Sequence, residues 1–210
     1  MLFRSHDSSA PRFRRPASMY PSVAASIPGE PDPATSMDLA HDSARALLDG
    51  VFHSSDPEVV RRVVALAADD GLTELAALWS AAPASTLPGA LWRLYVLHTW
   101  VQRSGDEVAR RYRAGSRTVP GLRYLTGFAE PPEVTQVQET MDDILRGAFT
   151  GDLGLALRRA GAVATLLAHG TAHLADEDPG EERTRQAERL LRTGEELTEA
   201  GRHAEEGRLD

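Results

Sequence analysis

Helical start and stop signals recur along the chain from Met37 to its end, and no segment shows the sustained apolar–polar alternation of a half-buried strand. The stretch SSDPEVVRRVVALAADDG (54–71), for example, begins with an N-cap serine and an early proline and closes on Gly71. A chain with helices and no strands buries its apolar faces helix on helix. The sequence therefore predicts an all-α fold, a single compact domain of about seven or eight helices.

The segment near 88–103 is predicted to be a central hydrophobic helix. Apart from Arg93, the residues from Leu91 to Val101 are apolar or aromatic on nearly every side of such a helix. A helix with this profile is buried by its neighbours. Its large aromatic residues are therefore expected in the core rather than in a ligand site: Trp92, Tyr95 and Trp100.

The last two helices are predicted to form an antiparallel hairpin. The first, from Leu153 to Ala175, carries an apolar seam at helical spacing, and the second, from Glu181 to Glu206, is highly charged. The inner stripe of the second is narrow and rich in small residues, among them Ala187, Gly194 and Gly201. A short connection between two such helices favours antiparallel packing.

The N-terminal segment 1–36 differs from the rest of the chain. It contains six prolines, seven serines and four arginines and has neither a helical nor a strand period. This composition predicts a disordered extension, or else a start of translation at Met37, where the first convincing helix begins. The predicted helical domain is then 37–210.

Composition excludes several kinds of chemistry. The chain has no cysteine and no lysine, so disulfides, Cys-ligated metals, thiol nucleophiles and Schiff-base lysines are ruled out. The 23 basic residues are all arginines, which indicates a GC-rich, bacterial genome. No apolar run is long enough to span a membrane. Neighbouring carboxylates such as Asp142 and Asp143 point about 100° apart on a helix and read as polar faces. We therefore expect a cytoplasmic protein without a cofactor and without enzymatic activity.

Two histidines are the best candidate for a chemical centre. His169 and His173 lie one turn apart on one helix face, where Asp176 or Glu177 could join them around a metal ion. The spacing fits, but no third histidine lies at a diagnostic interval, and His98 could join only through a tertiary contact. The favoured interpretation is a pair of helix-end histidines near unpaired carbonyls. A small metal-dependent hydrolase is kept as the weaker alternative.

The segment from Arg103 to Arg123 is strongly basic, with six arginines against two carboxylates. Within it, EVARRYRAGSRTVPGLRYL (107–125) resembles the helix-turn-helix of bacterial transcription regulators. The resemblance implies DNA binding, and it departs from the motif at the turn, where Arg113 replaces glycine, and at Pro120. The arginines that would contact nucleic acid in this alternative are Arg110, Arg111, Arg113, Arg117 and Arg123.

The leading hypothesis is a non-enzymatic helical interaction or regulatory protein that engages a protein partner or another copy of itself. It rests mostly on the absence of catalytic constellations, and the basic and acidic surfaces on different parts of the chain, whose net charge is −8, would make the contacts. Nucleic acid is a less favoured partner because this charge steers the protein away from phosphates.

Overall fold

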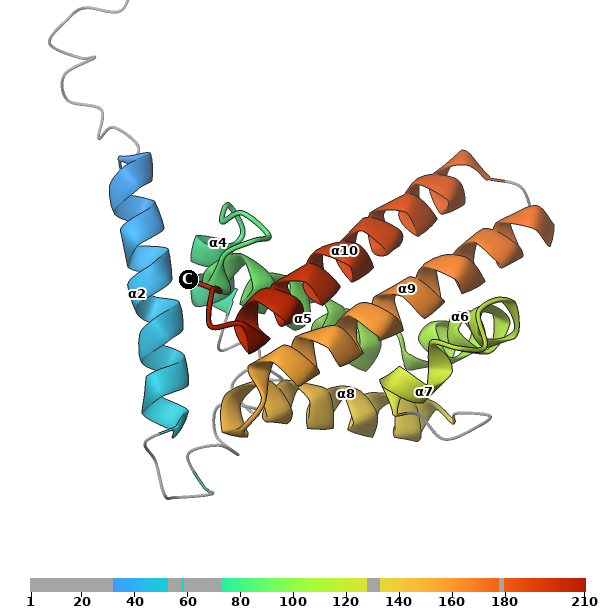
Figure 1. Cartoon of the computed structure of the whole chain (residues 1–210). Helices are drawn as coiled ribbons and strands as arrows, with labels where there is room; N and C mark the ends of the chain where they lie inside the picture. Colours follow the sequence, from blue (N-terminus) through green and yellow to red (C-terminus); the bar gives the residue numbers. More distant parts are fainter. Residues whose placement is uncertain (1–31, 53–57, 59–72, 128–132, 178–179) are drawn as a thin grey trace, which may run out of the picture. The chain divides into compact units, whose positions relative to one another are not determined.

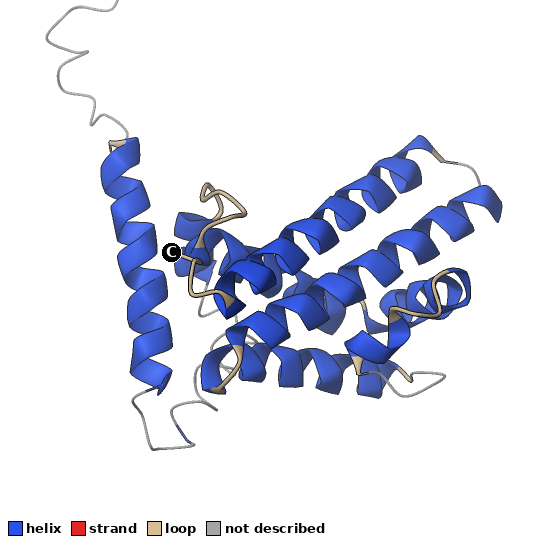
Figure 2. Ribbon diagram, in the orientation of Figure 1, coloured by secondary structure: helices blue, strands red, loops and turns tan. Residues whose placement is uncertain are grey.

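The structure, a computed structural model, describes residues 32–52, 58, 73–127, 133–177 and 180–210. All regular elements in these ranges are helices, which confirms the predicted all-α class (Figures 1 and 2). From Pro33 onward the chain forms one compact unit. Its helices are α2 (Pro33–Phe52), α4 (Thr73–Trp79), α5 (Leu87–Arg103), α6 (Gly105–Thr118), α7 (Arg123–Thr126), α8 (Val134–Thr150), α9 (Leu153–Glu177) and α10 (Glu181–Glu205).

Helices α5 and α9 form the centre of this unit. α9 packs against α5, α6, α7, α8 and α10, and α5 also contacts α2 and α4. The predicted central helix is thus confirmed, with Leu94 and Val101 fully buried. Its start is fixed by Thr86, whose hydroxyl accepts a hydrogen bond from the backbone N–H of Gly89 at 3.4 Å. The proline in its first turn has no N–H to leave unpaired.

α9 and α10 form the predicted hairpin, and their backbones touch. Gly161 faces Gly194, where an added Cβ would lie 2.8 Å from the Gly194 carbonyl oxygen. A Cβ on Gly201 would likewise lie 2.8 Å from the carbonyl oxygen of Gly154. No real side chain tolerates such distances to a neighbouring backbone. The small residues at seven-residue spacing therefore allow the two long helices to run in direct contact (Figure 1).

A second glycine contact joins α6 to α9. A Cβ on Gly115 would lie 1.9 Å from the carbonyl oxygen of Leu166, and one on Gly170 would lie 1.8 Å from that of Arg111. A glycine at this place in a sequence is typical of the residue that follows the end of a helix, but α6 continues past Gly115 to Thr118. The glycine is needed for close approach of two helices rather than for a helix end.

The N-terminal boundary also differs from the prediction. α2 begins at Pro33, so residues 33–36 are helical rather than part of a disordered extension. Proline suits the first helical position because its fixed φ already matches the helix. Ser43 of α2 accepts a hydrogen bond from Trp79 Nε1 at 3.0 Å, which ties α2 to α4. Residues 1–31 and most of the predicted helix at 54–71 lie outside the described residues.

Across the described ranges, no helix combines the length and the apolar character that a bilayer span requires.

Candidate functional site

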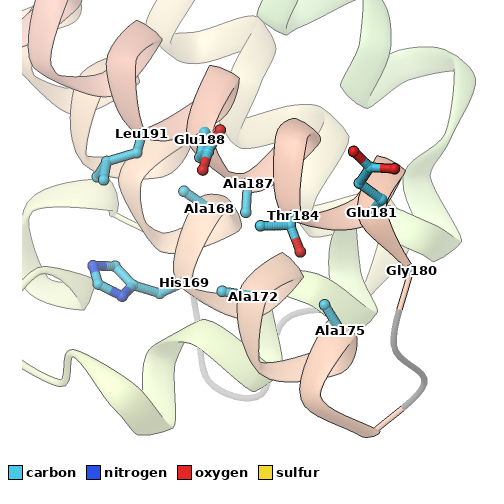
Figure 3. A pocket seen from close by; sticks show the side chains of 10 residues that line it. All are labelled: Ala168, His169, Ala172, Ala175, Gly180, Glu181, Thr184, Ala187, Glu188 and Leu191. Atoms are coloured by element: carbon cyan, nitrogen blue, oxygen red, sulfur yellow. The ribbon is translucent and has the colours of Figure 1, made fainter.

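Two open grooves lie beside α10. The first, the tryptophan groove, separates α10 from α5 and has a volume of about 560 Å³. The second, the hairpin groove, lies between α10 and α9 close to the turn that joins them and has a volume of about 730 Å³ (Figure 3). The walls of the two grooves differ in chemistry, and the first carries the features of a binding site.

The tryptophan groove has an apolar wall supplied by α5. Trp92, Val96 and Trp100 follow one another at four-residue spacing and therefore share one face of the helix. Both tryptophans are half-buried, and Val96 is 42% exposed. The ring of Trp92 stacks on Tyr95 with 6.3 Å between centroids, which fixes its orientation. Leu190 of α10 completes this apolar lining.

Arginines dominate the charged lining of the tryptophan groove. Three arginines face one glutamate there, and Arg93 is paired with that glutamate, Glu196, at 2.5 Å. Arg189 contacts Glu182 at 2.6 Å, and this hydrogen bond, with the charge of the arginine, lowers the pKa of the Glu182 carboxyl below its usual 4.5. Arg192 makes neither an ion pair nor a hydrogen bond with any described residue. Among the described residues, Arg192 is therefore a lining cation without an ion-pair partner beside the aromatic wall of the groove.

Arg111 supports the groove from the interior of the protein. Its guanidinium carbon lies 5.4 Å from the ring centroid of Trp100, and it donates hydrogen bonds to Gln186 Oε1 at 3.1 Å and to Thr171 Oγ1 at 3.0 Å. It also pairs with Glu107 one turn earlier on α6. Because Trp100 and Gln186 line the two walls of the groove, Arg111 fixes one wall relative to the other.

The five arginines proposed for nucleic-acid contact do not form one surface. Arg111 is only 7% exposed and its guanidinium is occupied by internal partners. Arg110, Arg113 and Arg117 are exposed on α6, and the side chain of Arg123 lies outside the described residues. The structure thus brings three of the five together on one exposed helix face.

The helix-turn-helix suggested by the sequence does not form. The turn of that motif would fall near position 113, but α6 runs unbroken from Gly105 to Thr118. The helix that follows, α7, has only four residues, too few to lie along a major groove. Pro120 lies in the connection between the two helices, where its missing N–H costs no helical hydrogen bond.

The histidine pair is divided between a groove and the solvent. His169 lines the hairpin groove opposite the α10 residues Glu188 and Leu191 (Figure 3). His173, one turn later on α9, is exposed. The side chain of Asp176 is not among those described. Within the described part of the chain, no three histidine or carboxylate side chains are grouped as metal ligands. The described residues therefore give the metal alternative no support beyond the spacing of the two histidines.

His98 has a partner other than the histidine pair. It is fully buried in α5, and its Nε2 lies 2.7 Å from Oδ1 of Asp142 on α8. Gln102 donates to the same oxygen at 2.7 Å. Asp142 was assigned to a polar face from sequence, but it is the acceptor that links two core helices. Neither groove is lined by these residues.

Comparisons with known proteins identify no relative. No protein-family model, curated protein or solved structure matches this chain.

The tryptophan groove was missed by sequence reasoning. Trp92 and Trp100 were expected in the core, and only Tyr95, 8% exposed, is buried there. The one available signal was the four-residue spacing of Trp92, Val96 and Trp100, which predicts a common face but not whether a neighbouring helix covers it.

Proposed function

We propose that this protein is a non-enzymatic binding protein whose tryptophan groove holds an acidic, apolar segment of a partner protein. The observation that carries the proposal is the combination of two half-buried tryptophans and the exposed Val96 with Arg192, a cation that has no partner among the described residues. Tryptophan and arginine are the residues that most often dominate the energy of protein interfaces.

The shape and charge of the groove favour a helical segment as the occupant. Two helices, α5 and α10, form its walls, and an amphipathic helix places apolar anchors at i, i+4 and i+7 into such a groove. Glutamates beside those anchors would complement the arginines of the lining, which improves orientation and association rate. A bacterial, cytoplasmic setting belongs to the same proposal.

A peptide titration tests this function. The probe is a fluorescein-labelled helical peptide with leucines at i, i+4 and i+7 and glutamates elsewhere, and a second peptide has lysine in place of every glutamate. Fluorescence anisotropy is expected to show at least tenfold tighter binding of the glutamate peptide, a difference of about 1.4 kcal/mol.

Three variants locate the binding. Val96→Glu and Arg192→Glu should each weaken binding of the glutamate peptide at least tenfold, because they add a like charge to the groove. Leu125→Glu, at a comparably exposed apolar residue of α7, is the matched control and should bind like the parent. Equal binding of the two peptides, or unchanged binding by Val96→Glu, would exclude the proposed site.

A further inference from the structure

A strip of three arginines covers the exposed face of α6. Arg110, Arg113 and Arg117 are spaced at i, i+3 and i+7 and therefore lie on one side of the helix. All three are exposed, and none of their guanidinium groups forms a hydrogen bond or an ion pair with any residue that the structure describes. The opposite face of α6 holds the buried Val108 and Tyr112 and packs on α9. This arginine strip thus points away from the protein.

A stripe with the opposite charge lies on α10. Glu188, Leu191 and Glu195 repeat the i, i+3, i+7 spacing, and the two carboxylates have no partner within the described ranges. Leu191 is 37% exposed between them, and it lines the hairpin groove together with Glu188 (Figure 3). Arg192 is adjacent in sequence but lines the tryptophan groove and pairs with neither glutamate. We call Glu188, Leu191 and Glu195 the glutamate stripe.

The two surfaces match in length and in chemistry. Seven residues of helix span about 10 Å, so the outer arginines of the strip and the two glutamates of the stripe are separated by the same distance. Guanidinium and carboxylate groups form paired hydrogen bonds, and the stems of arginine side chains cover exposed apolar groups such as Leu191. Most other described arginines already have an acceptor within the chain, whereas the side chains of the strip and the two glutamates of the stripe have no partner among the described residues.

The strip and the stripe of one chain do not face each other. α6 contacts α9 through the face opposite the strip, and the stripe belongs to a helix on another side of α9 (Figure 1). We propose that the arginine strip of one copy docks on the glutamate stripe of a second copy. This inference does not depend on the tryptophan groove, which remains open in such a contact.

The proposed contact joins two different surfaces and is therefore heterologous. A pair of copies joined in this way retains one free strip and one free stripe, so association continues into a ring or an open chain. The pairing is electrostatic and close to the solvent, and for this reason added salt weakens it. The net charge of −8 opposes approach of the copies at long range, so we expect association at high protein concentration.

Charge reversal tests the contact in both directions. One variant, R110E/R113E/R117E, has an acidic strip and an acidic stripe, and the other, E188R/E195R, has a basic strip and a basic stripe. Sedimentation velocity at low salt should show growing assemblies for the parent protein and monomers for each variant alone. An equimolar mixture of the variants should associate again, because each acidic surface of the first variant meets a basic surface of the second, and ~0.5 M salt should dissociate these assemblies.

Several outcomes would overturn the proposal. A parent protein that stays monomeric at high concentration and low salt excludes the contact, as does a mixture of variants that fails to associate. Continued assembly of E188R/E195R alone would place the arginine strip on another surface. Retention of a monomeric parent protein, but not of R110E/R113E/R117E, on heparin would assign the strip to a polyanion instead. Circular dichroism and unchanged binding of the glutamate peptide show that R110E/R113E/R117E is folded, and E188Q/E195Q replaces E188R/E195R if the reversal disturbs α10.

Discussion

α10 meets its two neighbours in different ways. Toward α9 it presents Gly194 and Gly201, and the two backbones are in contact without space between them. Toward α5 it presents Leu190 and arginines against two tryptophans, and a groove of about 560 Å³ remains. Small residues let helices approach fully, whereas large side chains on both walls hold them apart. A helix anchored firmly on one side can therefore leave the other side free for binding.

The largest expected effect is the loss of the glycine contact. In Gly161→Ala the new Cβ would lie 2.4 Å from Thr198 Oγ1 and 2.8 Å from the Gly194 carbonyl oxygen. Because backbone cannot move aside as a flexible side chain can, we expect a loss of about 3 kcal/mol in the free energy of unfolding. Urea denaturation measures it.

Gly50→Ala is the matched control for this experiment. Gly50 is also helical, but nothing lies within 4 Å of an added Cβ. Alanine is the better helix former, so this variant should gain up to about 1 kcal/mol. Equal effects of the two substitutions would mean that the hairpin is not in backbone contact.

A smaller loss of stability is expected at Arg111, which supports the tryptophan groove from the interior of the protein. Arg111→Met removes the hydrogen bonds to Thr171 and Gln186 and the cation over Trp100, and we expect a loss of about 2 kcal/mol. Arg110→Met, at the exposed neighbouring position, should change stability by less than about 0.5 kcal/mol. Thermal denaturation of the two variants compares them, and similar melting temperatures would show that Arg111 does not connect the walls.

Substitutions of residues that line the tryptophan groove should hardly affect the free energy of unfolding. Val96→Glu places a carboxylate at a position that is 42% exposed and near arginines, so we expect a change within about 0.5 kcal/mol while peptide binding is lost. Urea denaturation of this variant separates the two effects. A loss above about 1 kcal/mol would show that Val96 packs as a core residue and that the groove is closed.

The smallest effect concerns an ion pair at the edge of the tryptophan groove. The pKa of the Glu182 carboxyl is lowered from 4.5 by its hydrogen bond with Arg189 and by the positive charge of that arginine. A carboxyl with a lowered folded pKa stabilises the protein above its unfolded pKa, and this contribution disappears as the pH falls through the lower, folded value. Titration followed by carboxyl ¹³C NMR should give a pKa below 4.5 for Glu182 in the parent protein. The pKa of the same carboxyl should be higher in Arg189→Gln. A value unchanged by the substitution would show that the pair does not form in solution.

The sequence predicted those parts of the fold that depend on local signals. Helix periodicity and capping residues identify the segment near 88–103 and the hairpin, because both signals arise from neighbours along the chain. Gly115 shows where such signals fail. A glycine that ends a helix and a glycine that permits a helix crossing look the same in sequence, and only the neighbour α9 distinguishes them.

The candidate site depended almost entirely on tertiary placement. Arg111 could not be told apart from Arg110 within a basic run, although one is buried and the other exposed. In the same way, the apolar face of Trp92 and Trp100 predicted burial, but how far α10 stands away from that face is set by side chains about 90 residues later in the chain. Charge and hydropathy characterise a helix face, but they do not identify the element that packs against it.

The most direct test of the tryptophan groove uses the three tryptophans of the chain as internal reporters. Trp92 and Trp100 line the groove, whereas Trp79 is buried elsewhere and donates its indole N–H to Ser43. An ¹H–¹⁵N spectrum recorded during titration with the glutamate peptide should show the indole signals of Trp92 and Trp100 moving while that of Trp79 stays in place. Three stationary signals, or equal movement of all three, would contradict binding in this groove.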